Sequence, residues 1–444
     1  MSALGRPSTG RDGWHALAVL TLAAALAYTD RQILNLLVDP IRHEFAISDL
    51  EVSFLQGAAF AFIYAAMGLP LGRWADGHNR RNLVSAGIAL WSLATACCGL
   101  AHDFTQLFIA RMFVGIGEAA LAPAALSLIS DYFEPNRRGT AIGVFLAGMV
   151  GGTGVAILLG GALRSLFESG WANGMPLLGG LAPWRSVLIV LGAAGLIVAA
   201  FAAGMREPER DRQVPLSASR SAAISLTQVV RYLTLNAALF VPAYFALTVG
   251  NMADYGIGAW YPSLLMRVFR YSPLEVATHL GALAIALGAL GTIAGGMLAD
   301  AFERRGRIDG KLLVAVGGTT LAAIAIASCA LGSATSALVA YGVYSLMNSA
   351  ASTAGIAAMQ DVVPNRMRGL TTAIQSFLFT ALGLGLGPSL VAFLTERAFG
   401  GPTGVGRSIS VVDGSLLIGV AVLFALARAP YRRHRLPGSV VPWL

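Results

Sequence analysis

The stretches "GRWADGHNRR" (residues 72–81) and "GMLADAFERR" (residues 296–305) each follow a long apolar segment, one in each half of the chain. Both fit the pattern G-x-x-A-D-x-x-x-R-R. A second pair of motifs, "PNRRG" (135–139) and "PNRMRG" (364–369), recurs in the same order at nearly the same offset. Repetition at a fixed offset indicates a duplicated architecture, so we expect two halves that share one helical plan.

The composition places this plan in a lipid bilayer. Of the 444 residues, 56% are hydrophobic and 12% are charged, about half the charge density of an ordinary soluble domain. Apolar stretches of roughly 20 residues, the length of a spanning helix, recur about twelve times. They lie near residues 14–38, 50–74, 82–101, 105–130, 138–163, 184–205, 236–266, 275–300, 311–332, 334–361, 369–395 and 410–430. Because barrel strands are shorter and alternate, these runs predict an all-α membrane protein with twelve transmembrane helices in two six-helix bundles.

The polar segments predict the domain organisation. Residues 1–205 form one expected bundle and residues 236–444 the other, which ends in the basic tail "YRRHR". Residues 206–235, beginning "REPERDRQVPLSASRS", are expected to be a cytoplasmic linker. With the N-terminus inside, most of the 31 Lys and Arg residues fall on the inner side, so the positive-inside rule predicts an inner (plasma) membrane protein with both termini cytoplasmic. The same asymmetry accounts for the net charge of +8 without nucleic-acid binding.

The sequence shows no signature of an active site. Cys97, Cys98 and Cys329 lie in apolar segments without metal-ligand spacing. Neither a P-loop, nor H-E-x-x-H, nor G-x-S-x-G occurs. We therefore expect no enzyme activity, no catalytic residue, no metal and no cofactor.

Four ionisable residues interrupt the apolar segments: Asp30 and Arg31 in "YTDRQ", and Arg111 and Glu118 in "RMFVGIGEA". Each charge at the bilayer centre costs a few kcal/mol, so these groups need partners or water. Helical rise puts Asp30 and Arg111 at similar depth and leaves Glu118 either within reach of Arg31 or alone facing a cavity. We expect Glu118 and Asp30 to bind and release protons, with Arg31 and Arg111 as charge partners or substrate-headgroup contacts. A permanent ion-pair cluster that locks two helices is the alternative.

Two further groups of residues are candidate site residues. The repeated loop motif predicts a cytoplasmic gate of Gly72, Asp76, Arg80, Arg81, Asp300 and Arg304, in which an aspartate accepts hydrogen bonds from a helix N-terminus and pairs with arginine. Solvated, topogenic loop charge is the alternative. Polar residues in two segments of the second half predict a cavity lining of Asn251, Asp254, Tyr255, Tyr341, Tyr344, Asn348 and Ser352. Satisfied interhelical hydrogen bonds explain them equally well.

The repeated loop motif resembles that of the major facilitator superfamily, over essentially the whole chain. Within it, the chain is similar to the Spinster branch at "YTDRQ", "RMFVGIGEA", "SDYFEPNRRG", "WR" (184–185), "GAWYP" and "GALGTIAGG", and departs from it at "GMVGGTG" (148–154), where a proline is usual. The resemblance implies proton-coupled movement of lysolipids or sphingoid lipids. Two bundles rocking about a midplane site would provide alternating access.

These observations together predict a secondary active transporter for a small amphiphilic substrate and protons, embedded in the lipid bilayer and functional as a monomer. The first alternative is a proton-coupled symporter of small organic anions or sugar acids, because "DR" and "GEA" also resemble that branch. The alternative of another class is a gradient-independent lipid scramblase or membrane sensor.

Overall fold

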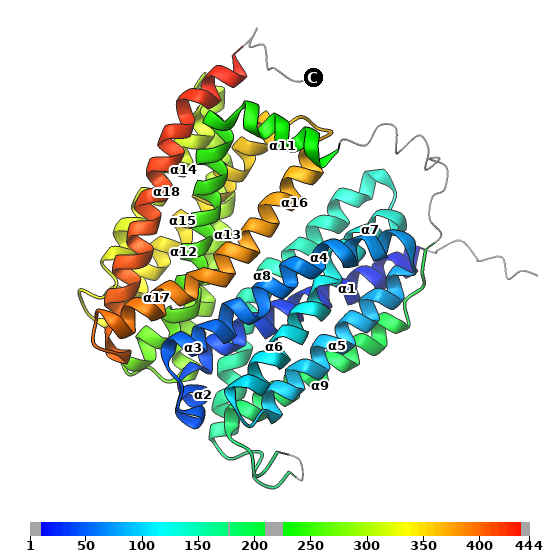
Figure 1. The fold of residues 1–444 in the computed structure, drawn as a ribbon, viewed down its shortest axis with the longest axis vertical. Helices are drawn as coiled ribbons and strands as arrows, with labels where there is room; N and C mark the ends of the chain where they lie inside the picture. Colours follow the sequence, from blue (N-terminus) through cyan, green and yellow to red (C-terminus); the bar gives the residue numbers. More distant parts are fainter. Residues whose placement is uncertain (1–9, 176–177, 209–224, 437–444) are drawn as a thin grey trace, which may run out of the picture. The chain divides into compact units, whose positions relative to one another are not determined.

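The computed structural model describes residues 10–175, 178–208 and 225–436, and the regular elements in this part of the chain are all helices (Figure 1). Each of the twelve predicted segments is helical. Among the residues that the structure describes, ten helices are long and apolar enough to cross a membrane. The number becomes eleven if α11 and α12, which meet at a sharp bend, are counted as one span. The remaining predicted span is α15 (Ala334–Val362), whose polar residues lower its hydropathy. The expected all-α membrane fold is confirmed.

The chain divides into two compact units. The first comprises Met1–Val214 and Ser272–Gly281, and the second Pro215–Tyr271 and Ala282–Leu444. Of the predicted linker, residues 209–224 lie outside the described residues, and its last ten residues form helix α11 (Leu226–Leu235). A capping box between Ser225 and Gln228 begins α11, and the chain turns by 104° into α12.

The first unit consists of long helices and of a series of short helices between α1 and α4. Its elements are α1 (Gly10–Ile33), η1 (Leu34–Leu36), α2 (Val38–Phe45), α3 (Asp49–Ser53), the π-helical η2 (Phe54–Ala58), α4 (Ala59–Gly77), α5 (Arg80–Leu100), α6 (Phe104–Ala119), α7 (Leu121–Tyr132), α8 (Pro135–Glu168) and α9 (Pro183–Ala203). Asn79 and Asp103 cap α5 and α6 by accepting main-chain hydrogen bonds. Proline begins α8 and α9, where its missing N–H costs nothing.

Close helix packing in the first unit depends on glycine. A Cβ atom at Gly117 in α6 would lie 2.6 Å from the carbonyl oxygen of Gly87 in α5, and the reverse distance is 2.8 Å. The two backbones therefore touch, as small residues permit in membrane bundles. This contact fixes α6, and with it Arg111 and Glu118, against α5.

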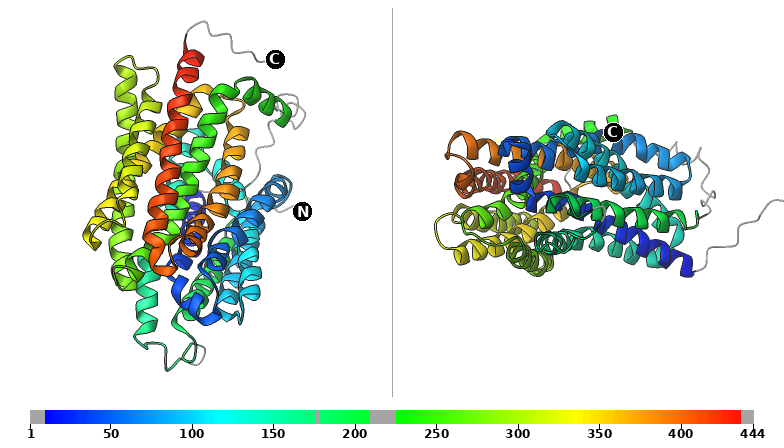
Figure 2. Two further views of the ribbon diagram at one scale, coloured as in Figure 1. Left: turned by 60° about the vertical axis from the view of Figure 1, so that its left-hand side comes forward. Right: turned by 90° about the horizontal axis from the view of Figure 1, so that it is seen from below.

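The second unit repeats the pattern of long helices, which Figure 2 shows from two further directions. Its elements after α11 are α12 (Ala237–Arg267), the part of α13 (Pro273–Arg304) that begins at Ala282, α14 (Gly310–Ala327), α15, α16 (Arg368–Leu378), the π-helical η3 (Phe379–Leu384), α17 (Gly385–Arg397), η4 (Pro402–Gly404) and α18 (Val405–Arg435). Helix α18 packs against α12 and α14. One apolar core of this unit gathers around Phe240, Met359 and Phe424.

Candidate functional site

Helices α1 and α6 bring the four predicted intramembrane charges of the first unit together. Asp30, Arg111 and Glu118 are only 2%, 3% and 1% exposed. Arg31 donates from Nε to Glu118 Oε2 at 2.7 Å, which makes a contact ion pair between the two helices. The sequence allowed Glu118 to lie within reach of Arg31 or to stand alone facing a cavity. The structure shows the first of these arrangements.

Aromatic rings surround the guanidinium of Arg31. Its Cζ lies 5.1 Å from the ring centre of Tyr28, 4.6 Å from that of Phe60 and 4.8 Å from that of Tyr64. A cation within about 6 Å of a ring centre is attracted by the negative ring face. Arg31 is thus held by Glu118 and by three aromatic rings from α1 and α4. The sequence analysis did not predict these ring contacts.

Arg111 does not form the expected ion pair with the Asp30 carboxylate in the part of the chain that the structure describes. It donates from Nη1 to the main-chain carbonyl of Asp30 at 3.4 Å and from Nε to that of Leu55 at 3.3 Å. Both carbonyls lie where the regular α-helical pattern is interrupted, at the end of α1 and inside η2. The Asp30 carboxylate instead accepts from Thr95 Oγ1 at 3.1 Å.

The cluster keeps spare hydrogen-bonding capacity. Asp30 Oδ1, Glu118 Oε1 and Arg111 Nη2 are buried and have no hydrogen-bond partner among the described residues. A buried polar group without a partner costs free energy. The cluster is therefore not a fully satisfied structural lock, and each carboxyl has an oxygen at which a proton can bind.

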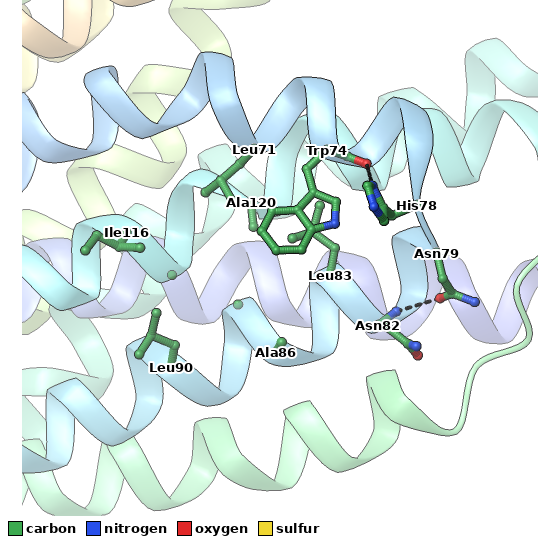
Figure 3. A pocket seen from close by; sticks show the side chains of 12 residues that line it. Leu71, Trp74, His78, Asn79, Asn82, Leu83, Ala86, Leu90, Ile116 and Ala120 are labelled. Carbon is green, nitrogen blue, oxygen red and sulfur yellow. Dashed lines mark hydrogen bonds between the residues drawn. The ribbon is translucent and has the colours of Figure 1, made fainter.

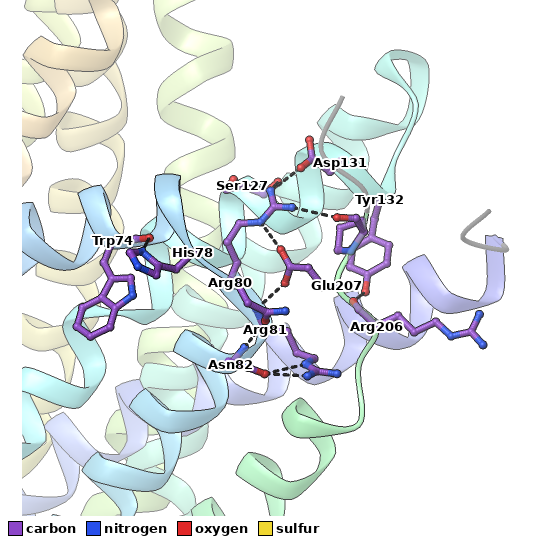
Figure 4. Close-up of polar contacts among 12 residues, drawn as sticks. Trp74, His78, Arg80, Arg81, Asn82, Ser127, Asp131, Tyr132, Arg206 and Glu207 are labelled. Carbon is purple, nitrogen blue, oxygen red and sulfur yellow. Dashed lines mark hydrogen bonds and ion pairs between the residues drawn. The ribbon is translucent and has the colours of Figure 1, made fainter. Parts of the chain in front are cut away.

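The loop motif of the first unit forms an ion-pair network at one end of the bundle (Figure 4). Arg80, at the first position of α5 and only 2% exposed, pairs with Asp131 of α7 and, at 2.8 Å, with Glu207 beyond α9. Glu207 also accepts from the Arg81 main-chain N–H at 2.8 Å. Three segments of one unit are therefore joined by a single arginine.

The other gate candidates of the first unit have less defined roles. Asp76 lies in the last turn of α4, and its side chain is outside what the structure describes. A Cβ atom at Gly72 would meet Pro123 of α7 only at 3.9 Å, an ordinary contact. The role of both residues in a gate stays a prediction.

In the second unit the equivalent network uses different residues from those that the repeat predicts. Asp300 and Arg304 are exposed, and the described part of the chain shows no ion pair for them. Instead Lys311, at the second position of α14, donates to Asp361 at the end of α15 at 2.5 Å. The loop between α13 and α14 is longer than that between α4 and α5. Arg304 therefore ends α13, Arg305 follows it, and Lys311 lies in the first turn of α14, as Arg80 lies in the first turn of α5.

This second network also includes the basic tail. Arg435 in the last turn of α18 pairs with Glu303 at 2.5 Å and with Asp361 at 3.2 Å. Arg428 pairs with Asp309 at 2.8 Å. The sequence analysis did not name Asp131 and Asp361 as the carboxylates of these networks. Their position could have indicated it, because each shortly precedes a copy of the repeated P-N-R motif.

At the opposite end of the first unit, the two residues of the "WR" motif, Trp184 and Arg185, form a second group of contacts between helix ends. Trp184 donates from Nε1 to Glu44 at 2.6 Å, and Arg185 donates to the same carboxylate at 2.7 Å. Arg185 also binds the main-chain carbonyls of Gly99 and Ala101, at 3.1 and 2.5 Å. These contacts join the ends of α2, α5 and α9.

Four of the seven predicted cavity residues line one polar pocket of about 280 Å³ in the second unit. They are Asn251, Asp254, Asn348 and Ser352. Tyr344 lies behind them and donates to Asp254 Oδ1 at 2.6 Å. Tyr341 packs against Tyr261, with 4.9 Å between ring centres. Neither Tyr341 nor Tyr255 lines this pocket.

A second hollow, of about 460 Å³, lies between α4, α5 and α6 and is mostly apolar (Figure 3). Leu71, Leu90 and Ile116 line it, with Trp74 across one side and Asn82 at one end. It lies apart from the charge cluster and contains no acidic or guanidinium group among its lining residues. In the described residues, no group of His, Cys, Asp and Glu is arranged to hold a metal ion.

The chain belongs to the Major Facilitator Superfamily, whose family model matches residues 20–388. It is therefore a multi-pass membrane transporter, not an enzyme. Among solved structures it is similar to a bacterial homologue of the human lysosomal transporter Spinster in an inward-facing, unoccupied conformation. The identity is 27% and the TM-score 0.77, over 96% of this chain and 97% of that chain. The predicted superfamily and Spinster resemblance are confirmed.

Curated relatives include transporters of different cargo. An MFS-type efflux pump of Mycolicibacterium smegmatis is 26% identical over 95% of this chain and 94% of that protein. A hexuronate transporter of Bacillus subtilis is 25% identical over 92% and 93%. The sphingosine-1-phosphate transporter SPNS2 of Mus musculus is 26% identical over 85% and 69%. The family thus defines a secondary transporter with a small-molecule substrate.

Proposed function

We propose that this protein is a proton-coupled transporter that moves an amphiphilic lipid, such as a lysolipid or a sphingoid lipid, by alternating access. The observation that carries the proposal is the buried pair of Arg31 and Glu118, in which Oε2 is bound and Oε1 has no partner. A carboxyl in this position has a cation that favours its charged form and a desolvated surrounding that favours its neutral form. A change in water access between two conformations shifts that balance and moves a proton.

The lipid cargo is supported by the likeness to the Spinster homologue and to the mouse sphingosine-1-phosphate transporter. The predominantly apolar helices of both units suit an acyl chain, since a polar group facing it would lose affinity. The hexuronate transporter supports the second candidate, a proton-coupled symporter of sugar acids. That candidate requires several hydroxyl contacts, which the polar pocket around Asp254 offers.

Three further features belong to the proposal. Both termini lie in the cytoplasm of a cell whose plasma membrane holds the protein, because the inner side then carries the Arg80 and Lys311 networks. The six-helix halves at residues 1–205 and 236–444 move against each other about the linker 206–235. A monomer is sufficient, because one chain supplies both halves.

Reconstitution of the purified protein in sealed vesicles tests the proposal. With an imposed pH gradient, we expect concentrative movement of a lysolipid and no concentration of hexuronates. Lipid movement that ignores the gradient and only equalises the leaflets would identify a scramblase. Gradient-driven hexuronate accumulation without lipid movement would identify the sugar-acid symporter, and the absence of any flux would favour a sensor.

A further inference from the structure

The polar pocket of the second unit has a marked charge asymmetry. Its lining contains one charged side chain, Asp254, and six neutral polar ones, which are Asn251, Thr292, Asn348, Ser349, Ser352 and Thr353. Arginine and lysine are absent from the lining residues. The pocket therefore has a net negative charge that no lining residue offsets.

Asp254 is held in position by neutral donors only. Tyr344 Oη and Asn348 Nδ2 both donate to its Oδ1, at 2.6 and 3.2 Å. Asn348 also donates to Tyr344 Oη at 3.3 Å, so the three groups form a closed set. Asp254 itself is exposed to the pocket, while Asn348 is buried. Hydrogen bonds from neutral donors orient a carboxylate without removing its charge, which leaves Asp254 available to a cation.

A second carboxyl group lies close to this pocket. Asp413 of α18 is 0% exposed, and neither of its oxygens has a hydrogen-bond partner among the described residues. Its Oδ1 lies 2.7 Å from the position of a Cβ atom at Gly256, two residues beyond Asp254 on α12. The ionisable groups that face Asp413 are Asp254, Tyr344 of α15 and Cys329 after α14, and all of them are acids.

The remaining lining groups also suit a cation. Asn251 Oδ1 is a buried acceptor without a partner in the described part of the chain. The serine and threonine hydroxyls add oxygen acceptors. Phe379, at the start of η3, adds an aromatic ring to the wall, and carboxylate together with aromatic rings is a common setting for quaternary ammonium groups.

We propose that this pocket binds the ammonium end of the transported amphiphile, so that the preferred cargo has an alkylammonium headgroup rather than a purely anionic one. This inference rests on the proposed lipid function and adds the charge of the headgroup to it. The volume of about 280 Å³ suits a compact group such as a primary amine or trimethylammonium. Sugar acids and lysolipids with a bare phosphate lack the cation that Asp254 requires.

Equilibrium binding to the purified full chain tests the inference with two lipids that share one acyl chain, lysophosphatidylcholine and lysophosphatidic acid. We expect the wild type to prefer the choline lipid, and Asp254→Asn to weaken choline-lipid binding about tenfold, the scale of one charge-assisted contact, with little effect on the acid. Asp254→Glu should restore part of the preference. Thr320→Val, which removes an exposed hydroxyl of α14 outside the pocket, should retain it. Thermal unfolding of each variant checks that the fold is intact.

An unchanged headgroup preference in folded Asp254→Asn would overturn the inference. So would competition by Na⁺ that depends on Asp254 and affects both lipids equally, because the pocket would then hold an inorganic cation. These outcomes are separable from failure of the proposed function. If no lipid moves in vesicles but Asp254-dependent choline-lipid binding persists, the transport proposal fails and the ammonium pocket stands.

Discussion

Arg31 and Glu118, 87 positions apart in the chain, form a contact ion pair of 2.7 Å inside the first unit. The pair joins the last turn of α1 to the last turn of α6, next to the touching backbones of Gly87 and Gly117. Only one oxygen of the carboxylate takes part. The geometry therefore separates a bound oxygen, which holds the helices together, from an unbound one, which is open to a proton.

Glu118→Gln should abolish most pH-driven transport. The amide keeps the size of the side chain and can still accept from Arg31, but it cannot bind and release a proton at physiological pH. Substrate binding at constant pH should persist within about threefold, because less than 1 kcal/mol of contact is lost. Uptake into vesicles under an imposed pH gradient measures the first effect and equilibrium binding the second.

Glu168→Gln provides the matched control, since Glu168 pairs with Arg164 on the surface of α8 and is exposed. It should transport like the wild type. A Glu118→Gln variant that keeps a normal dependence on the pH gradient would remove Glu118 from the coupling role and leave the pair with a structural one.

Two double-mutant cycles should distinguish the two arginines. Arg31→Met with Glu118→Gln should be clearly non-additive in the free energy of unfolding, by about 1–3 kcal/mol for side chains in direct contact. Arg111→Met with Asp30→Asn should show a smaller coupling, because Arg111 binds the main-chain carbonyl of residue 30, which survives the substitution. Equal coupling in both cycles would mean that Arg111 acts on the Asp30 carboxylate as strongly as Arg31 acts on Glu118.

Arg80→Ala should destabilise the protein by about 3–5 kcal/mol, the usual cost of removing one partner of a buried ion pair. Asp131 and Glu207 would both lose their cation. Arg80→Lys should recover little, since a single ammonium cannot reproduce the separate Nε and Nη1 contacts. Arg81→Ala is the neighbouring control and should cost much less. Thermal unfolding in detergent measures all three, and similar losses at both positions would contradict the network.

Lys311→Ala should lower the free energy of unfolding by about 2 kcal/mol, the scale of a charge-assisted hydrogen bond. Arg304→Ala should change it by less than about 0.5 kcal/mol, as expected of an exposed side chain. The opposite ranking would show that the sequence repeat, and not the start of α14, identifies the residue equivalent to Arg80.

The helical plan was predictable because hydropathy and repetition are properties of long segments. Twelve apolar runs and two repeated loop motifs were enough to predict the all-α membrane fold and its family. The ion pairs at the ends of the bundles were harder to predict from the sequence. A few additional residues between α13 and α14 leave Arg304 at the end of α13 and Arg305 just after it. Sequence spacing alone does not show which cation then occupies the start of the next helix.

The charge cluster was predictable in its members and only partly in its contacts. Ionisable residues in apolar helices are few, so Asp30, Arg31, Arg111 and Glu118 were evident. The partner of Arg111 was not, because it is a main-chain carbonyl made available by the local break at Leu55 and by the end of α1. Backbone acceptors have no residue-type signature, so helical depth alone suggested the Asp30 carboxylate instead.

The aromatic rings around Arg31 hold this cation in place beside Glu118, whose charge changes when it binds or releases a proton. Three ring faces attract the guanidinium independently of the charge on Glu118. A cation tethered only by its carboxylate would relocate whenever that carboxylate became neutral, and the site would lose its shape along with its charge. With the rings in place, the guanidinium can keep its position when Glu118 binds a proton, so that Oε1 offers the same binding position to each successive proton.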